Sequence, residues 1–315
     1  MAYLLDLLVI GELNADVVVT DPDPVPAFGQ AERLVRDVRL TLGSSSAITA
    51  CGAARLGLRV AMVGVVGDDP LGRFVLDALA ARGVDTSACR VAADRATGVS
   101  VILGNGTDRA ILTALGTIAD TRASDVPDAL LGRARHVHVG SLFLQPGLAT
   151  DLPALFRSAR AAGATTSLDP NWDPSGAWNG GFAGALAETD VVLPNAGEAL
   201  RLTGATDAET AARALSGEAR IAVVKLGAAG ALAADGRRPI VRADARRVDP
   251  VDTTGAGDSF DAGFIAARLD GRAVDDALAY AVACGSLSTR AAGGTDGQAT
   301  RDDLEAWLRE GGHAH

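Results

Sequence analysis

Short apolar runs rich in β-branched residues alternate along this chain with longer runs rich in alanine and leucine. Such an alternation predicts an α/β fold, in which buried parallel strands are joined by helices. The expected strands are Leu4–Ile10, Arg59–Val63, His136–Val139, Thr165–Leu168, Val191–Leu193 and Ile221–Val224. The expected helices are Ser44–Leu56, Leu71–Ala81, Leu148–Ala162, Ala196–Thr203, Ala208–Leu215, Gly255–Leu269 and Val274–Arg290.

Two pairs of extended segments interrupt this alternation. The first pair flanks a proline-rich turn, Asp21–Pro26, and the second flanks Asn105-Gly106, a dipeptide typical of tight β-hairpins. The four segments are Asp16–Thr20, Arg33–Leu42, Gly98–Leu103 and Arg109–Ala114. Antiparallel segments do not fit a βαβ sheet, so we expect a small β appendage over the main sheet. It would comprise residues 12–42 and 97–115, and residues 1–11, 43–96 and 116–315 would form the core.

Charge and cysteine content argue against several classes of protein. The 315 residues carry a net charge of -10, whereas nucleic-acid and acidic-membrane binders draw affinity from basic residues, so neither partner is expected. Cys51, Cys89 and Cys284 form no CxxC pair, which argues against a disulfide framework or a zinc site. No apolar run approaches the roughly 18 residues of a membrane span, and the first ten residues have no basic leader. We therefore expect a cytoplasmic protein.

The run Asp252–Phe260 joins a glycine-rich turn to the start of an expected helix. The small residues Gly255, Ala256 and Gly257 let the backbone approach a ligand closely, and the first helical amides have no intrahelical partner. Those amides carry the positive end of the helix dipole and predict an anion hole for a phosphoryl group. Asp258 would accept the proton of an attacking hydroxyl, and we expect the amides to keep its carboxylate ionised. The alternative is that Asp258 only stabilises the helix start.

The same run resembles the second signature of the PfkB/ribokinase family of carbohydrate kinases. Four further motifs of that family occur in the family's order, namely Gly11–Asp16, Gly43–Gly72, Pro194–Glu198 and Lys225–Gly230. The resemblance covers nearly the whole chain. It implies a Rossmann-like, three-layer αβα ribokinase-like core with a small β-sheet lid. It also implies transfer of the γ-phosphoryl group of ATP, with Mg²⁺, to a hydroxymethyl group of a sugar.

The acceptor site is expected at the end of the first strand. Asn14 and Asp16 lie at the edge where an open α/β sheet binds ligands, and their amide and carboxylate suit sugar hydroxyls. Asn14 is alternatively a turn residue. The resemblance adds Gly43 and Ser44 to this site. Gln145, shortly after the third expected strand, is a further candidate for contact with the sugar.

The nucleotide site is expected after the fifth and sixth strands. The resemblance associates Asn195 and Glu198 with magnesium and phosphate, and Glu198 would act on Mg²⁺ through a water molecule, since magnesium retains several waters. The loop of Lys225, Gly227 and Gly230 would bind the nucleotide, with Lys225 reaching a phosphate or the ribose. Two structural alternatives remain: Glu198 as a first-turn helix acid, and Lys225 as a solvated side chain.

A monovalent-cation site is implied beside the anion hole. Asp252 and the carbonyl of Thr254, with backbone from residues 288–295, resemble the family's cation loop, which implies a K⁺ ion. Carbonyl oxygens supply most ligands of such a site, and sequence does not encode their positions.

Two departures from the family pattern bear on the acceptor. Ser44 stands where many members have a second glycine, and Ile48 stands where they have an asparagine near the sugar. The run Asp169–Pro174 resembles the DPNxR motif of fructokinases and ketodeoxygluconate kinases, but Asp173 replaces the arginine. An acid repels an anionic substrate and makes no bidentate guanidinium contact, so a neutral sugar is expected.

Several alternatives stay open at this point. His136 and His138 point to one side of a strand and are expected as polar residues in the ligand crevice rather than as a metal pair, because no third ligand is evident. The acceptor could be a nucleoside instead of a sugar, or the chain could be a non-catalytic sugar- or nucleotide-binding regulator. The appendage would close over the sugar and pair with a second copy in a homodimer.

Overall fold

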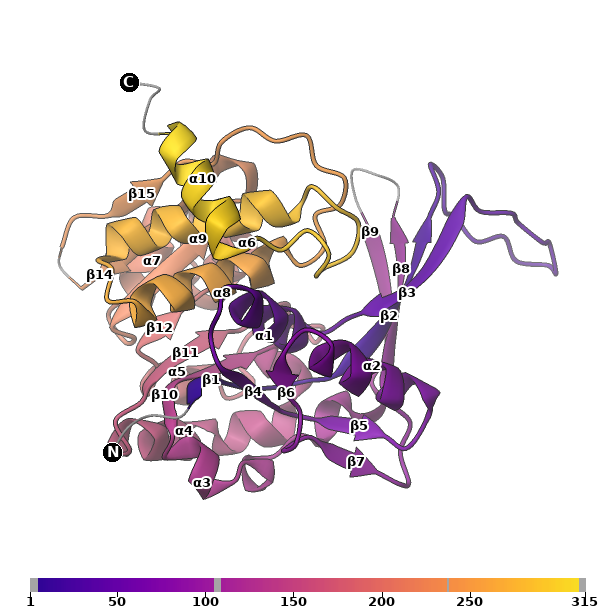
Figure 1. The fold of residues 1–315 in the computed structure, drawn as a ribbon, viewed down its shortest axis with the longest axis horizontal. Helices are drawn as coiled ribbons and strands as arrows, with labels where there is room; N and C mark the ends of the chain where they lie inside the picture. The colour runs from indigo at the N-terminus through magenta and orange to yellow at the C-terminus, as the bar shows by residue number, and fades with distance from the viewer. Residues whose placement is uncertain (1–4, 105–108, 237, 312–315) are drawn as a thin grey trace.

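The computed structural model describes residues 5–104, 109–236 and 238–311. Within these ranges the largest sheet has nine strands in the order β15-β14-β13-β12-β11-β10-β1-β4-β6 (Figure 1). Their bounds are Leu5–Ile10 (β1), Val60–Val63 (β4), Val84–Asp85 (β6), Ala134–Gly140 (β10), Thr165–Asp169 (β11), Val191–Val192 (β12), Ile221–Lys225 (β13), Ala231–Asp235 (β14) and Val241–Ala243 (β15). Neighbouring strands from β6 to β13 are parallel, as expected, and β14 and β15 extend the sheet in antiparallel orientation.

Strand β1 shows why the sheet is buried on both faces. Every residue of β1 is buried, and successive side chains point to opposite faces. Leu7 and Val9 pack into one hydrophobic cluster, whereas Leu8 and Ile10 pack into the other. The continuous apolar run therefore serves two cores at once, which gives the three-layer αβα arrangement.

Five helices cover each face of the sheet within the described ranges. One layer contains Ser45–Arg55 (α1), Pro70–Ala80 (α2), Ala256–Leu269 (α8), Val274–Ser288 (α9) and Arg301–Gly311 (α10). The other contains Asp128–Leu131 (α3), Pro146–Ala161 (α4), Phe182–Leu186 (α5), Ala196–Thr203 (α6) and Ala208–Leu215 (α7). A two-stranded ribbon of Val65–Gly67 (β5) and Arg90–Ala92 (β7) lies beside this core. Short 3-10 turns cover Gly116–Asp120, Ala123–Asp125, Leu142–Leu144 and Gly227–Ala229.

A four-stranded sheet projects from one side of the core and is called the lid below (Figure 1). Its strands, in the order β3-β2-β8-β9, are Asp37–Leu42 (β3), Asn14–Thr20 (β2), Gly98–Gly104 (β8) and Arg109–Ala114 (β9). The expectation of four antiparallel segments is wrong at the centre of this sheet, because β2 and β8 are parallel. Both strands start at the rim of the core, with Asn14 opposite Gly98, and so run outward together.

Some boundaries differ from those expected. Strand β3 begins at Asp37 rather than Arg33, because Arg33 pairs with Asp23 and turns the preceding loop back on itself. Helix α9 ends at Ser288, two residues early. Strands β14 and β15 and helix α10 were not expected, since the alanines of β14 carry no strand preference. Leu4 and the Asn105-Gly106 turn lie outside the described residues.

Candidate active site

The start of helix α8 exposes two backbone amides at the carboxyl edge of the sheet. Gly255 caps the helix with φ of +72°, and an added Cβ there would lie 2.8 Å from the Cα of Gly294. No side chain caps the helix, and the amides of Gly257 and Asp258 have no acceptor among the described residues. Unpartnered amides at the positive end of a helix suit a phosphoryl group. The residues present therefore fit the predicted anion hole, in which Ala256 opens the helix.

Asp258 lies beside these amides and lines a cavity of about 600 Å³, although only 8% of the residue is exposed. Burial, reinforced by the charge of Asp169, raises the pKa of Asp258 to about 7. The expectation that the helix amides keep this carboxylate fully ionised is therefore wrong. Loss of solvent outweighs the favourable end of the helix, and the result is a base that titrates near neutrality.

Asn14, Asp16 and Gly43 meet at the acceptor end of the cavity. The Nδ2 of Asn14 donates to Oδ1 of Asp16 over 2.8 Å, and both residues line the cavity. A Cβ added to Gly43 would lie 2.2 Å from Oδ1 of Asp16 and 2.4 Å from Nδ2 of Asn14. Only glycine leaves room for this pair. Burial raises the pKa of Asp16 to about 7.

Ser44 adopts φ of +69°, a conformation that favours glycine, which fits the expectation that a glycine is typical at this position. Its Oγ donates to the carbonyl of Glu12 over 2.5 Å and accepts from the amide of Ala47 at 2.9 Å. These two bonds hold the serine in place at the start of α1. Ile48, one turn further along, lines the cavity and contacts the position where a Cβ on Gly294 would lie.

The cavity has a volume of about 600 Å³ and lies between the core and the lid. Its polar lining includes Asn14, Asp16, Ser44 and Asp258. The apolar lining consists of Ile48, Ile102, Ile111, Leu115, Ile118, Leu144, Trp172 and Pro174. The acceptor site therefore offers both polar and apolar contacts.

Gln145 does not reach this cavity. The side chain is fully buried, and its Nε2 donates to the carbonyls of Gly140 and Ser141. The sugar contact expected for Gln145 does not fit this placement, because the residue turns back to brace the end of β10. The neighbouring Ser141 lines the cavity instead.

Asn195 and Glu198 form a capping box at the start of α6. The side chain of Asn195 accepts from the amide of Glu198 at 3.0 Å, and Glu198 accepts from the amide of Asn195 at 2.9 Å. Burial raises the pKa of Glu198 to about 7. The expected structural use of Glu198 as a first-turn acid is thus present. Its carboxyl is of the oxygen-donor type that Mg²⁺ takes, so the residue also fits the magnesium role.

Lys225, at the end of β13, faces inward. Its Nζ lies 2.8 Å from Oδ2 of Asp169 and 3.2 Å from each carboxylate oxygen of Asp261. Two buried carboxyl groups thus hold the ammonium, and only 12% of the lysine side chain is exposed. A direct contact of Lys225 with a nucleotide does not fit this placement, and neither does the alternative of a solvated lysine. Gly227 and Gly230 follow with φ of +60° and +88°.

Asp252 organises the loop before α8. Its Oδ1 accepts from the amide of Thr254 at 2.8 Å, and its Oδ2 accepts from the amide of Gly293 at 2.9 Å. These hydrogen bonds help hold the pKa of Asp252 below its usual value despite burial. The Oγ1 of Thr254 accepts from Arg109 of the lid at 3.0 Å. Within the residues that the structure describes, no three His, Cys, Asp or Glu side chains gather to hold a metal ion.

Comparison with known proteins decides the family. The model of the pfkB family carbohydrate kinases matches residues 4–301. This chain belongs to the pfkB family. The pfkB assignment confirms the predicted family and the predicted enzyme class, a kinase with an alcohol group as acceptor.

Relatives of this pfkB kinase agree with that assignment over most of their length. It is 33% identical over 283 residues to a fructokinase from Klebsiella pneumoniae, covering 84% of this chain and 91% of that one. It is 32% identical over 305 residues to an ATP-dependent ribose-1-phosphate kinase from Halopiger xanaduensis, covering 96% and 98% of the two chains.

A solved structure of a putative ribokinase II from E. coli, in complex with ATP and Mg²⁺, superposes on the pfkB kinase with a TM-score of 0.85. The two share 25% identity, with 98% of this chain and 100% of that chain covered. The predicted ribokinase-like fold is confirmed.

Asp173 of this pfkB kinase is held within its own loop. The carboxylate accepts from the amide and hydroxyl of Ser175 and from the amide of Trp178. Only 3% of Asp173 is exposed, and it does not line the acceptor cavity. The expected repulsion of an anionic substrate by Asp173 is therefore not supported. Position 173 nevertheless has no arginine, so the bidentate guanidinium contact of the DPNxR motif is absent.

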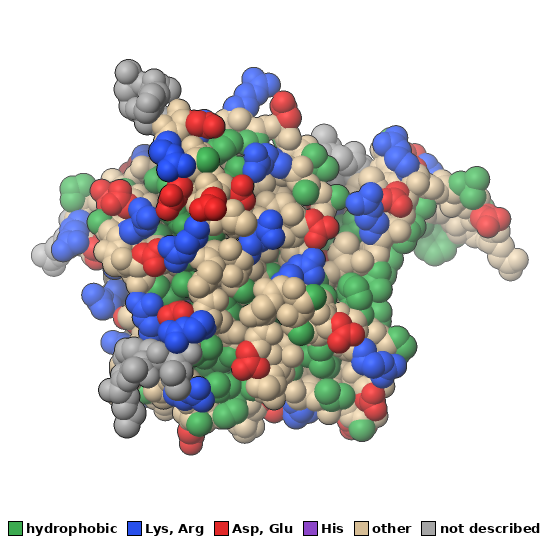
Figure 2. All heavy atoms as spheres, viewed as in Figure 1, with side chains coloured by type: hydrophobic (Ala, Val, Ile, Leu, Met, Phe, Trp, Pro, Cys, Tyr) green, Lys and Arg blue, Asp and Glu red, His purple; other side chains and the backbone are tan. Residues whose placement is uncertain are grey.

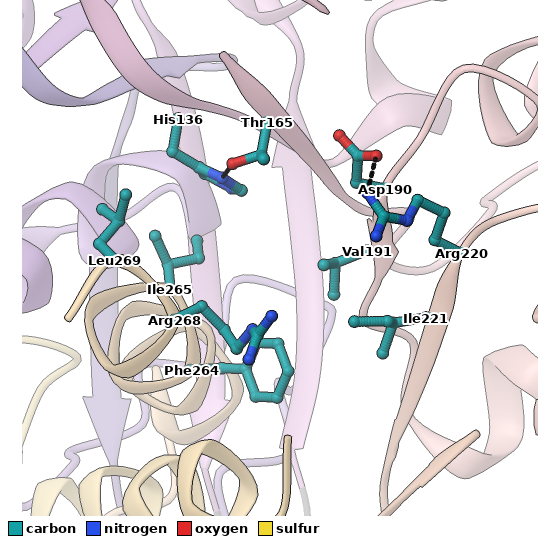
Figure 3. Close-up of a pocket in the computed structure, with 10 residues that line it drawn as sticks. All are labelled: His136, Thr165, Asp190, Val191, Arg220, Ile221, Phe264, Ile265, Arg268 and Leu269. Atoms are coloured by element: carbon teal, nitrogen blue, oxygen red, sulfur yellow. Dashed lines mark hydrogen bonds and ion pairs between the residues drawn. The ribbon is translucent and has the colours of Figure 1, made fainter. Parts of the chain in front are cut away.

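His136 and His138 do not line the acceptor cavity. His136 lines a smaller cavity of about 110 Å³ at the opposite edge of the sheet, between the strands and the second half of α8 (Figure 3). It bonds to Thr165 and to Ser167, and Ser167 also bonds to His138. Burial lowers the pKa of the two rings to about 3 and 4. The pair is neutral and structural, so the expected position in the ligand crevice is wrong.

Sequence reasoning missed several residues that line or support the site. Buried Glu12 accepts from Ser46 at 2.6 Å and from Ser141 at 2.9 Å, and it lines the cavity. The other missed residues are Arg109, Asn171, Trp172, Asp169 and Asp261. Asp169 and Asn171 end or follow a parallel strand, and that position alone could have marked them as site residues.

Proposed function

We propose that this pfkB kinase transfers the γ-phosphoryl group of ATP to a hydroxymethyl group of a neutral sugar. The observation that carries the proposal is the juxtaposition of the unpartnered amides of Gly257 and Asp258 with the Asp258 carboxylate at the floor of a cavity. The amides that would stabilise the transferred phosphoryl group lie next to the carboxylate that would accept the hydroxyl proton. Phosphoryl transfer requires both groups at the reacting atoms.

In the proposed step the acceptor hydroxyl lies between Asp258 and the phosphoryl group. Its oxygen forms the new bond to phosphorus while the bond from phosphorus to the ADP oxygen breaks. The hydroxyl proton passes to the carboxylate of Asp258. The amides of the Gly255–Asp258 turn would hold the growing negative charge of the phosphoryl oxygens. Asn14 and Asp16 would hold the other hydroxyls of the sugar.

The donor side is assigned to the neighbouring strand ends. Asn195 and the loop of Gly227 and Gly230 would bind the nucleotide, and Glu198 would hold Mg²⁺ through a water molecule. Magnesium would supply positive charge against the phosphate oxygens. A K⁺ ion would lie at the loop of Asp252 and Thr254, where it would add positive charge beneath the anion hole.

A neutral acceptor follows from the charges that line the cavity. Glu12, Asp16 and Asp258 contribute three carboxyl groups, and burial raises the pKa of each, that of Asp16 and Asp258 to about 7. Arg109 contributes one guanidinium, which bonds to Thr254. At the pH where the Asp258 base is ionised, Asp16 is ionised as well, and an anionic sugar would meet more negative than positive charge. The decisive measurement is ADP release with fructose, ribose and other neutral sugars against their phosphates and acids. A clear preference for an anionic acceptor would contradict this part of the proposal.

The catalytic assignment has its own test. We expect Asp258→Asn to lower kcat by roughly three orders of magnitude while the sugar still binds, because the variant keeps the shape and loses the base. Calorimetry with the preferred sugar would serve as the binding control. Turnover close to that of the wild type would refute the role of Asp258, and sugar binding without turnover in the wild type would favour a regulator.

A nucleoside is the second candidate acceptor, and the apolar residues that line the cavity favour it. Trp172 lines the cavity and is 54% exposed. The guanidinium carbon of Arg201 lies over its ring, 4.9 Å from the centroid. An aromatic face of this kind can stack on a base. Nucleosides belong in the same ADP-release panel, and a higher kcat/KM for a nucleoside than for any sugar would select this alternative.

Assembly and location complete the proposal. The lid exposes large apolar side chains, among them Phe28 at 98% and Leu34 at 87%, and hydrophobic side chains are visible along it (Figure 2). We assign this surface to pairing with a second copy in a homodimer. The three unpaired cysteines and the use of ATP suit the cytoplasm. No helix in the described ranges is long and apolar enough to cross a membrane.

A further inference from the structure

A buried charge cluster lies beneath the first turn of α8, outside the acceptor cavity. It comprises Asp169 at the end of β11, Lys225 at the end of β13 and Asp261 on α8. We propose that Lys225 is a positioning residue for phosphoryl transfer, whose ammonium, locked between Asp169 and Asp261, keeps the neighbouring Asp258 available as a charged base. This inference rests on the proposed function.

The ammonium is fixed in place by its contacts. Three carboxyl oxygens lie 2.8, 3.2 and 3.2 Å from Nζ, the last two on the single side chain of Asp261, and 12% of the lysine side chain is exposed. The side chains of Asp169 and Asp261 are 3% and 0% exposed. A compact ammonium with three donors fits this arrangement, whereas the planar fork of a guanidinium does not. Lys225 is the one lysine in a chain whose other basic residues are arginines.

Helix geometry brings this charge next to the catalytic turn. Asp258 and Asp261 are three residues apart on α8 and so lie on neighbouring positions of one helix face. A Cβ added to Gly257 would lie 3.5 Å from Nζ of Lys225. The glycine therefore allows the ammonium to pack directly against the backbone that carries the predicted anion hole.

The groups around Asp258 either raise or lower its pKa. Burial raises the pKa of Asp258 most strongly, and the charges of Asp169 on β11 and Glu12 after β1 act in the same direction. Lys225 on β13 and a hydrogen bond from Ser45 on α1 oppose them. Burial would lower the pKa of Lys225, but the carboxyl groups of Asp169 and Asp261 raise it well above its ordinary value. Burial raises the pKa of Asp261 well above its ordinary value, whereas, despite burial, Lys225 and Asp261 hold the pKa of Asp169 below it, so Asp169 carries the negative charge beside the ammonium. The lysine thus stays charged across the pH range of an assay.

Two substitutions with opposite expected signs test the inference. In Lys225→Met the acid limb of the pH profile of kcat, where activity falls as the base is protonated, should move to higher pH by about one unit or more. The reason is that Asp258 loses a nearby opposite charge. In Asp169→Asn the limb should move to lower pH, because a like charge is lost. The KM for ATP should change less than threefold in Lys225→Met. If Lys225 contacted the nucleotide instead, Lys225→Met would raise the KM for ATP at least tenfold and leave the acid limb of the pH profile unchanged. That result would overturn the inference.

A matched control and an activity-independent readout complete the design. Arg220→Met removes a basic side chain at the opposite end of the same strand and should leave the limb unchanged. Carbon NMR titration of Asp258 in the protein without substrates measures the same shifts directly. If the wild type turned over no acceptor, the proposed function would fail and this titration would still decide the role of Lys225. If Lys225→Met did not fold, Lys225→Gln would take its place, and an unchanged pH profile in that variant would overturn the inference.

Discussion

Asp16 and Asp258 line the same cavity, and burial raises the pKa of each carboxyl to about 7. At the residue scale this places the candidate base at the pH where a small change in surroundings changes its charge. Asn14 donates a hydrogen bond to Asp16, which favours ionisation but does not offset burial. The acceptor end of the cavity is therefore sensitive to pH.

A pH profile should show this sensitivity. A general base works only when deprotonated, so kcat/KM should fall as the pH decreases through about 7. The profile should be recorded with saturating ATP and limiting acceptor, across the range from about pH 5 to 9. Activity that stays constant down to about pH 5 would contradict a base with this raised pKa.

Gly43 offers a second test at this scale. An added Cβ would lie within 2.4 Å of both Asn14 and Asp16, so Gly43→Ala must displace the pair. We expect KM for the acceptor to rise by at least about tenfold, with a smaller effect on KM for ATP. Gly132→Ala is the control, since its Cβ would meet only the carbonyl of Asp128 at 3.5 Å. Equal acceptor KM in the two variants would rule out this role for Gly43.

Residue identity predicted the position of the catalytic turn but not its electrostatics. The glycine-rich run before an apolar helix pattern sufficed to locate Gly255 and Asp258. The ionisation state of Asp258 depends on Asp169, which approaches from a strand nearly ninety positions earlier in the chain. Local sequence also could not show that Asp173 and Gln145 turn inward to brace their own loops.

At the scale of elements, strand β9 reaches the turn before α8. Arg109 of β9 donates to Oγ1 of Thr254 over 3.0 Å, so one hydrogen bond joins the lid to the loop that precedes the anion hole. The same guanidinium partly opposes the rise that burial causes in the pKa of Asp16, and it helps to hold the pKa of Asp252 low. The position of the lid is thus coupled to the charged groups beneath it.

Removal of this contact should loosen the lid. We expect Arg109→Gln to raise the acceptor KM roughly three- to tenfold, because the variant loses a charge-assisted bond and the field across the cavity. Hydrogen exchange of β8 and β9 amides should also become faster. Arg39→Gln on β3 is the control, since Arg39 pairs with Asp37 on its own strand. Unchanged KM and exchange in Arg109→Gln would exclude this role of the contact.

Element types were predicted better than pairings. The continuous apolar runs located β1, β4 and β10 to β13, because burial on both faces leaves a pattern in the sequence. They did not locate the short strands β5, β6 and β7. The parallel pairing of β2 with β8 left no such pattern, since each strand looks like half of a hairpin. Helix α10 escaped notice because its polar residues dominate and Leu304 alone is fully buried within it among the described residues.

At the scale of the whole molecule, the exposed apolar residues of the lid predict association. Phe28, Leu34, Val38 and Leu40 are all at least 46% exposed, and they belong to β3 or to the loop before it. We expect light scattering at micromolar concentration to give the mass of a dimer, and Phe28→Ser/Leu34→Ser to shift the protein toward monomer. A monomer in the wild type would contradict the proposed assembly.

The lid is also the part of the molecule that depends most on the rest of the chain. Residues 14–20 pair with residues 98–104, and the segment between them builds α1, β4 and α2 of the core. Its central pairing therefore cannot form until that layer has condensed, because a long connection must first be brought together. During refolding, the helical signal will return before the acceptor cavity forms, and sugar binding will be the last property to recover.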